Sequence, residues 1–427
     1  MGIIKLSSNN PNLSYIIGKN PNSGMQIRSI RKGYGFGWYN SNNESEYSIY
    51  FKDLCDMSYL DNNKEFDYLN RTQYISPYMY IDLLNEFLDI KKQHPDDIIN
   101  KYENSVMISL IKIGNPNFIN SFNISGYDIK FFKYKDMDKY GSLIITTTNT
   151  IKDLINYTEL LCIMLIVFSR YQNKDKQKNT FPIERIMKYA KLISNLDCNF
   201  YLRYYFSKQL LQNKDYFYKI NPILENSSQY KIKLAYGDTQ TQRFNFASSN
   251  LDLEHNLLDI GTGEGFYLQY AKLLQDKNKI YYGIDTDPKV LELAKHKAEK
   301  MELKNVSLFS NLENLKLSID NTESINIILL EVIEHMSIEE AEKLIHDILT
   351  TISFHKFLIS TPNYDFNKFY SQDQTYRHHD HKWEMTSNEF NNWMHKILKS
   401  YNFTYKFAQI GHSVNDIYST QCIIITY

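Results

Sequence analysis

A glycine-rich turn is the first candidate for chemistry in this chain. Within LLDIGTGEGF at residues 257–266, Gly261 and Gly263 stand between an apolar run and a helix-forming run. Glycine lets a backbone turn tightly and approach a ligand closely. The dinucleotide-binding fingerprint GxGxxG needs a glycine at position 266, where this chain has Phe266. The turn therefore favours a ligand other than a dinucleotide.

Carboxylates around this turn favour a cationic ligand. Asp259 and Glu264 flank it, and Asp285 ends the next predicted strand, 20 residues after the last glycine. Acidic side chains repel a pyrophosphate but suit the ammonium and sulfonium of S-adenosylmethionine (SAM), and a strand-terminal carboxylate can accept hydrogen bonds from ribose hydroxyls. We predict SAM as the cofactor, bound by Asp259, Gly261, Gly263 and Asp285. A nucleotide, or a turn that binds nothing, is the alternative.

Two carboxylates and an imidazole follow another predicted strand. In LLEVIEHM, the residues Glu331, Glu334 and His335 are spaced i, i+3 and i+4, so a helical turn would point all three the same way. This ligand set suits Mn²⁺ or Mg²⁺, with Fe²⁺ and Zn²⁺ as alternatives. The carboxyl end of a parallel strand faces the ligand crevice. The competing interpretation is a Glu-His pair of the kind that also occurs in methyltransferases without a metal.

A dense set of histidines lies further along the chain, in RHHDHKWE at residues 377–384. One of these histidines could supply a fourth protein ligand to a metal ion. The spacing does not distinguish between His378, His379 and His381. The competing interpretation is a solvated polar loop.

The elements that must position these residues alternate between strand and helix. Ser337 is a predicted helix N-cap, and Glu340 three residues later completes a capping box. Thr386 or Ser387 caps a later helix, and Glu389 completes a second box if Thr386 is the cap. Two late β-like runs lack a helix between them. The pattern predicts a class I, Rossmann-like SAM methyltransferase domain with a mostly parallel sheet and an antiparallel edge hairpin. The predicted strands are 257–260, 279–285, 306–309, 325–330, 356–360, 404–410 and 421–426.

The first half of the chain shows a different pattern. Short β-rich runs at 106–113 and 142–147 precede helical patterns at 154–168 and 186–211, with a polar loop at 172–179. This order predicts an α+β domain. We expect the N-terminal domain at 1–225, a linker at 226–250 and the methyltransferase domain at 251–427.

Composition excludes several classes of protein. The 427 residues are 43% hydrophobic and 15% aromatic, which excludes a disordered chain. Net charge is −1, but residues 1–250 carry +7 and residues 251–427 carry −8. The basic half suits nucleic acid or an acidic partner, or is simply a lysine-rich solvated surface. The four cysteines form no CxxC pair, and neither a leader nor a membrane span is expected, which favours the cytoplasm.

The second half resembles a known family. The segments EVIEH, STPNYDFN and RHHDHKWEMTSNEF, in this order after a SAM-type turn, resemble the 3′-terminal RNA ribose 2′-O-methyltransferases of the HUA-enhancer type. The resemblance covers about 250–427 and implies Glu331, Glu334, His335 and His381 as metal ligands, with Arg377 nearby. The family pattern continues Phe-Glu-Trp-Thr-Arg, whereas this chain has Trp-Glu-Met-Thr-Ser at 383–387 and lacks that arginine.

The first half resembles the N-terminal region of bacterial members of this family over about 1–220. The similarity lies in NPNLSYIIGKNP near the start, YLNRTQYISPYMYIDLL at 68–84, and the strand–helix run at 142–170. It implies association with a kinase–phosphatase and an RNA ligase in RNA repair, through residues 1–225.

The resemblance implies an enzyme that methylates the 2′-hydroxyl of the 3′-terminal ribose of RNA. Mn²⁺ (or Mg²⁺) would hold the free 2′- and 3′-hydroxyls and lower the pKa of the attacking one. His335 or His379 would take the proton, with Arg377 as a further catalytic residue. Two alternatives remain: a SAM methyltransferase acting on a small-molecule diol or quinone precursor, and a binding module in which the first domain activates an RNA ligase and methylation is secondary.

Overall fold

The computed structural model describes most of the chain. Cys55, the stretch 68–76 and part of the predicted loop at 172–179 lie outside the described residues. The described residues are 2–30, 33–40, 43–53, 77–88, 90, 93–114, 116–122, 124–135, 137–173, 181–196, 198–319, 323–370 and 376–427.

The chain divides into two compact units. Unit 1 comprises Met1–Cys198 and Gln209–Leu211, and unit 2 comprises Asn199–Lys208 and Gln212–Tyr427. The candidate site predicted from the sequence lies wholly in unit 2.

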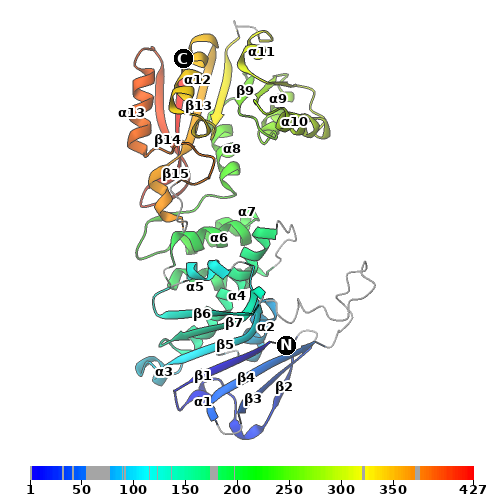
Figure 1. The fold of residues 1–427 in the computed structure, drawn as a ribbon, viewed down its shortest axis with the longest axis vertical. Helices are drawn as coiled ribbons and strands as arrows, with labels where there is room; N and C mark the ends of the chain where they lie inside the picture. The colour runs from blue at the N-terminus through cyan, green and yellow to red at the C-terminus, as the bar shows by residue number, and fades with distance from the viewer. Residues whose placement is uncertain are drawn as a thin grey trace. The chain divides into compact units, whose positions relative to one another are not determined.

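Unit 1 is built on an antiparallel sheet with the strand order β2-β3-β4-β1-β5-β7-β6. Helices α2 (Pro77–Phe87) and α4 (Ile151–Asn173) pack on this sheet (Figure 1). The N-terminal α+β prediction is therefore confirmed. The strands are β1 (Ile3–Ser8), β2 (Gln26–Ile30), β3 (Gly33–Asn40), β4 (Asn43–Asp53), β5 (Asn104–Lys112), β6 (Tyr127–Tyr134) and β7 (Met137–Thr147). Short helical turns are α1 (Leu13–Ile16), η1 (Pro21–Ser23), α3 (Pro95–Ile99) and η2 (Pro116–Phe122).

The single helix predicted over 186–211 is wrong, because the chain forms α5 (Ile183–Asn195) and α6 (Phe200–Leu210) instead. The Asn199 side chain accepts a hydrogen bond from the Leu202 backbone N–H at 3.1 Å. Short polar side chains compete with helical backbone hydrogen bonds in this way and favour a new helix start.

Unit 2 contains an eight-stranded sheet with the order β11-β10-β9-β12-β13-β15-β14-β8. The first five strands in this order, β11, β10, β9, β12 and β13, pair in parallel. The remaining strands β15, β14 and β8 are added at one side by antiparallel pairing. The predicted parallel sheet with an antiparallel hairpin is therefore confirmed. The strands are β8 (Ile232–Lys233), β9 (Leu257–Ile260), β10 (Tyr281–Ile284), β11 (Val306–Phe309), β12 (Ile325–Leu330), β13 (Phe354–Pro362), β14 (Thr404–Val414) and β15 (Ile417–Thr426).

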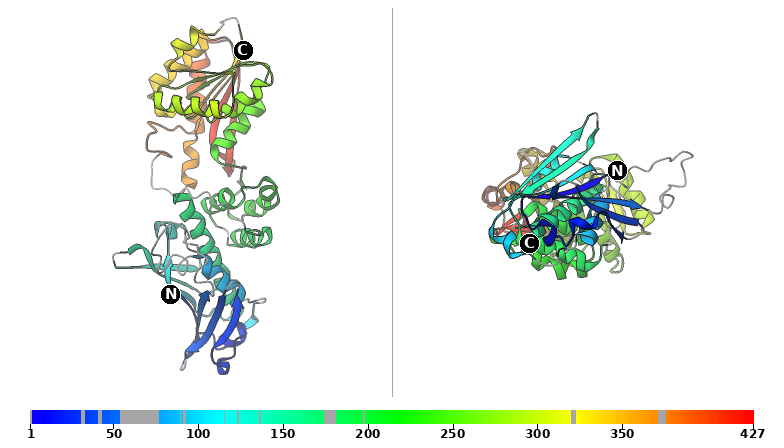
Figure 2. Two further views of the ribbon diagram at one scale, coloured as in Figure 1. Left: turned by 90° about the vertical axis from the view of Figure 1, so that its right-hand side faces the viewer. Right: turned by 90° about the horizontal axis from the view of Figure 1, so that it is seen from below.

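Helices cover both faces of this sheet (Figure 1 and Figure 2). Central strand β12 is buried throughout, with Ile327 and Leu329 in one core and Ile328 and Leu330 in the other. Alternate side chains of a strand face opposite sides, so each core is closed by its own set of helices. The first core takes residues from α11 (Leu312–Lys316), α12 (Ile338–Thr351) and α13 (Ser387–Leu398), and the second from α8 (Thr239–Asn250), α9 (Leu268–Gln275) and α10 (Pro288–Lys300).

The segment 226–250, expected to be a linker, instead contains β8 and α8, and helix α7 (Lys214–Glu225) precedes it. The composition of α8 is polar, and within it only Gln242 and Ala247 are buried. Asp238 caps its start by accepting a hydrogen bond from the Thr241 backbone N–H. So few inward residues leave little apolar periodicity to detect. The domain ranges derived from the sequence remain predictions.

Across the described residues, none of the helices has the length and apolar character that crossing a membrane requires.

Both predicted capping boxes are present. The Ser337 hydroxyl accepts a hydrogen bond from the Glu340 backbone N–H, and the Glu340 carboxylate accepts one from the Ser337 backbone N–H. Thr386 and Glu389 form the same arrangement at the start of α13. Helix α12 begins directly after the motif that carries Glu331 and His335, so its cap fixes where that motif ends.

We predict that Ser337→Ala lowers the free energy of unfolding by about 1 kcal/mol, because the first turn of α12 loses a hydrogen-bond acceptor. Chemical denaturation followed by circular dichroism measures the change. Ser353→Ala, at an exposed position outside any helix, is the matched control and should change it by less than about 0.5 kcal/mol. Equal effects of the two substitutions would contradict the capping role.

Candidate active site

The glycine turn after β9 packs directly against the segment that carries the predicted metal ligands. Gly261 has a φ of +79°, and a Cβ there would lie 2.4 Å from a methyl carbon of Val332. The position therefore excludes any side chain, both for its backbone conformation and for space. This contact joins the predicted cofactor turn to EVIEH at the carboxyl ends of the strands.

The structure brings three of the four predicted cofactor residues together. Asp285 accepts a hydrogen bond through Oδ2 from the Gly263 backbone N–H at 2.8 Å, so the strand-terminal carboxylate holds the turn that Gly261 opens. Asp259 lies below this turn and is only 2% exposed. Tyr281 donates a hydrogen bond to its Oδ2. Burial raises the pKa of Asp259 to about 6.

Glu334, His335 and His381 form the centre of the candidate site. Each offers a ligand atom, and these atoms all lie within 4.8 Å of one another. Glu334 is fully buried, and Thr361 donates a hydrogen bond to its Oε2 at 3.2 Å. Its Oε1 has no hydrogen-bond partner among the described residues. A buried carboxylate oxygen without a donor, beside two imidazoles, fits a divalent cation.

Glu331, the remaining predicted ligand, is held at the edge of this group. It has a φ of +58°, and its backbone N–H donates to the Ser360 carbonyl. Its Oε2 lies 3.3 Å from Arg243 Nη1, and its Oε1 accepts a hydrogen bond from the Ser360 hydroxyl. Glu331 therefore pairs with a protein cation rather than joining the other three.

A hydrogen-bond network fixes His381 and reaches Arg377. The Nδ1 of His381 lies 2.6 Å from an oxygen of Glu384, which also accepts from the Arg377 backbone N–H. The other oxygen of Glu384 accepts from Asn367, and Asn367 accepts from the Arg377 guanidinium. Arg377 also donates to the Asn363 carbonyl. Its side chain thus holds the loop after β13, and its predicted catalytic role remains a prediction.

The structure distinguishes the three histidines that the spacing could not. His381 belongs to the central group, whereas His378 and His379 are exposed and form a separate group with Asp380. Asp380 links the two groups, because its Oδ2 lies 3.4 Å from His335 Nδ1. His379, predicted as an alternative base, is therefore at the rim of the site.

Burial changes the protonation behaviour of the central residues. Burial and the neighbouring Glu331 raise the pKa of Glu334 well above its ordinary value. Burial lowers the pKa of His335. A neutral imidazole can accept a proton or bind a metal ion, and a buried carboxyl gains stability when a cation lies beside it.

Sequence reasoning missed Arg243 and Glu384. Arg243 precedes the glycine turn in a polar stretch that offered no motif, so the sequence contained no signal for it. Glu384 stands three residues after His381, a spacing that could have been recognised as a carboxylate orienting a ligand histidine.

The fold and the site together define a class. A glycine turn after the first parallel strand, a carboxylate at the end of the second and polar side chains at the carboxyl ends are the features of a Rossmann-like SAM methyltransferase domain. A family model described as a methyltransferase domain matches residues 251–411. A second model, the Hen1 N-terminal domain, matches residues 3–229, and the chain belongs to this Hen1 family.

Curated relatives match less than half of this chain. A small RNA 2′-O-methyltransferase of Xenopus tropicalis is 28% identical over 185 residues, which are 41% of this chain and 50% of that protein. One of Arabidopsis thaliana is 30% identical over 176 residues, which are 37% of this chain and 19% of that protein. The chain thus spans half or less of the length of these relatives.

The solved structure of a Pnkp1/Rnl/Hen1 RNA repair complex contains a chain with the same fold. The two chains align with a TM-score of 0.80 and 23% identity, covering 100% of each.

We predict that Arg243→Ala lowers the free energy of unfolding by about 3 kcal/mol, because it leaves the half-buried Glu331 without its cation. Combining it with Glu331→Gln should cost less than the sum of the single changes, by at least about 1 kcal/mol. Denaturant unfolding measures all four proteins. The exposed pair Lys231 and Asp416 is the matched control and should show much weaker coupling. Additive single changes at Arg243 and Glu331 would contradict the pairing.

We predict a pH dependence that comes from Asp259. Its pKa is about 6 in the folded chain against an ordinary 3.8, so folding takes up a proton between these values. The free energy of unfolding that this carboxyl contributes is therefore full below pH 3.8 and falls by about 3 kcal/mol as pH rises through 6. Asp259→Asn should lack this fall in urea unfolding between pH 4 and 7. The exposed Asp276→Asn controls for the loss of one carboxylate, and an identical pH profile in Asp259→Asn and the wild-type chain would contradict the assignment.

Proposed function

We propose that this chain transfers a methyl group from SAM to the 2′-hydroxyl of the 3′-terminal ribose of RNA, with the help of a divalent cation. The supporting observation is the group formed by Glu334, His335 and His381 beside the glycine turn. The names of the curated relatives agree with this activity.

The residues that would hold the cation are Glu334, His335 and His381, with Glu331 as a fourth. Mn²⁺ fits this mixture of carboxylates and imidazoles, and Mg²⁺ is the alternative. When bound, the ion would supply Lewis acidity that lowers the pKa of a ribose hydroxyl. Glu384 orients His381 through a hydrogen bond to Nδ1, which leaves Nε2 as the ligand atom.

The same residues suit a terminal ribose as the methyl acceptor. A 2′-hydroxyl is a weak nucleophile at neutral pH, so a neighbouring neutral imidazole must accept its proton. His379, which lies outside the proposed ligand set, can accept the proton, whereas His335 can do so only while it does not hold the cation. Two adjacent free hydroxyls occur only at a 3′ end, which provides the selection for RNA termini. Gly261, Gly263 and Asp285 would bind SAM beside Val332, and the buried Asp259, hydrogen-bonded to Tyr281, would support the turn from within the fold.

We also propose that the N-terminal region, residues 1–225, binds a kinase–phosphatase and RNA ligase complex and activates the ligase. The match of residues 3–229 to the Hen1 N-terminal domain supports this assignment. So does the similarity in fold to a chain from a Pnkp1/Rnl/Hen1 complex. The partners would bring RNA ends with free 2′- and 3′-hydroxyls to the methyltransferase domain before ligation.

We predict that the purified chain labels a short single-stranded RNA with 2′,3′-hydroxyl ends when given radiolabelled SAM and Mn²⁺. RNA ending in a 2′-deoxy or 3′-phosphate nucleotide should remain unlabelled, because the reacting hydroxyl or its neighbour is missing. Glu334→Gln and His381→Ala should lower the rate at least about 100-fold. His378→Ala, which removes an exposed histidine of the same loop, is the matched control and should retain the rate within about threefold.

Three outcomes would contradict the proposal. Methylation of the 2′-deoxy terminus would exclude the 2′-hydroxyl as acceptor. Full activity in chelator would exclude the cation. Labelling of small diols or quinone precursors in preference to RNA would favour the small-molecule alternative.

A further inference from the structure

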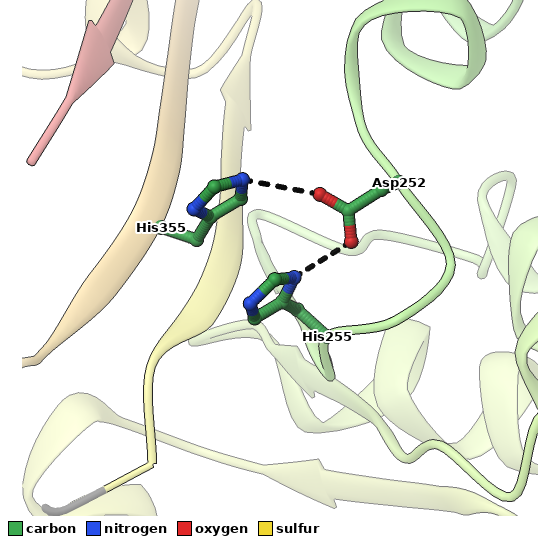
Figure 3. A group of neighbouring side chains, drawn as sticks. All are labelled: Asp252, His255 and His355. Atoms are coloured by element: carbon green, nitrogen blue, oxygen red, sulfur yellow. Dashed lines mark hydrogen bonds and ion pairs between the residues drawn. The ribbon is translucent and has the colours of Figure 1, made fainter.

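A second cluster of metal-ligand side chains lies in unit 2. The carboxylate of Asp252 bridges two histidines: its Oδ1 is 2.6 Å from His255 Nδ1 and its Oδ2 is 3.2 Å from His355 Nε2 (Figure 3). The two imidazole rings are stacked, with centroids 4.3 Å apart and planes 11° apart. One ligand atom from each residue lies within 4.8 Å of the others.

This cluster is separate from the candidate active site. His255 stands two residues before β9, and His355 is the second residue of β13. Both positions are at the amino ends of parallel strands, whereas Glu334 follows the carboxyl end of β12. No step proposed for methyl transfer uses the three residues of the cluster.

The segment that carries Asp252 is held firmly in place. The Glu254 backbone N–H donates a hydrogen bond to Asp252 Oδ1 at 3.0 Å. The Asp252 backbone carbonyl accepts hydrogen bonds from Tyr270 on α9 and from the fully buried Asn326 on β12. The carboxylate therefore points at the two histidines from a backbone fixed by a helix and a strand. Such support is what keeps metal ligands oriented.

The ligand types of the cluster and their proximity suit a borderline cation. Zn²⁺ binds imidazole nitrogen and carboxylate oxygen at about 2.0–2.2 Å, so neighbouring ligand atoms in a tetrahedral site are about 3.3 Å apart. In the structure the carboxylate makes contacts of 2.6 and 3.2 Å to the two histidines, each through a different oxygen, so the side chains would move slightly apart to admit an ion. Two imidazoles favour Zn²⁺ over Mg²⁺ or Ca²⁺, which prefer oxygen. The side chains are 29–39% exposed, so an ion and a water ligand can reach them.

We propose that Asp252, His255 and His355 bind a Zn²⁺ ion that fastens the segment before β9 to the start of β13. The ion would bind a carboxylate oxygen and the two ring nitrogens in place of their hydrogen bonds, with one imidazole turned out of the stack. It links positions 100 residues apart in the sequence, and it stabilises the methyltransferase domain because it binds only the folded chain. The site has three protein ligands and a fourth position for water.

The test compares metal binding by full-length chains. Inductively coupled plasma mass spectrometry after equilibrium dialysis gives the Zn²⁺ bound per chain, and Co²⁺ absorption reports the ligand geometry. His355→Ala and Asp252→Asn should each bind one Zn²⁺ fewer than the wild-type chain. His296→Ala, an exposed histidine that contacts two glutamates on α10, is the matched control and should bind the wild-type number. His381→Ala removes any ion from the candidate active site, so the two sites are counted separately.

Thermal unfolding provides a second readout. Zn²⁺ at about 100 times its dissociation constant should raise the Tm of the wild-type chain by roughly 5 to 10 °C more than that of His355→Ala. Asp252→Asn retains the size of the side chain, and circular dichroism confirms that each variant folds. Equal Zn²⁺ content, Co²⁺ spectra and Tm shifts in the wild-type chain and both variants would overturn the proposal. The histidines would then simply donate hydrogen bonds to the carboxylate. None of these readouts depends on methyl transfer.

Discussion

The buried carboxylate of Glu334 is the group on which the rest of the candidate site depends. A fully buried carboxylate with one oxygen lacking a donor is unfavourable unless it is protonated or a cation lies beside it. Arg243 supplies one positive charge, but it pairs with Glu331 instead. With two carboxylates and one arginine, the site has more negative than positive charge. The two neighbouring imidazoles offer nitrogen ligands, so a metal ion suits this site.

The fold brings these groups together because parallel strands end at the same edge of a sheet. β9 leads into the glycine turn, β10 into Asp285, and β12 into Glu331 and Glu334. The positive φ at Gly261 and the contact it makes with Val332 set the cofactor turn against the metal-ligand motif. The opposite edge of the same sheet carries the second histidine cluster, so the two ends of the strands serve different purposes.

Most of this architecture could be predicted from the sequence, because short apolar strands, glycine turns and capping boxes are local signals. The bounds of β9, β11 and β12 equal the predicted ranges. Ser337 and Thr386 cap helices as expected. Contacts between distant segments gave no such signal. The pairing of Arg243 with Glu331 and of Asp252 with His355 depends on tertiary packing. The spacing alone left the choice among three neighbouring histidines open, the family resemblance implied His381, and the folded loop places His381 in the central group.

The most direct test of the central claim is anomalous diffraction from crystals of the chain grown with Mn²⁺ and a SAM analogue, recorded at the manganese absorption edge. The account predicts a peak within coordination distance of Glu334 Oε1 and of ring nitrogens of His335 and His381. A map without a peak at that position, with Glu334 hydrogen-bonded to another protein group, would contradict it.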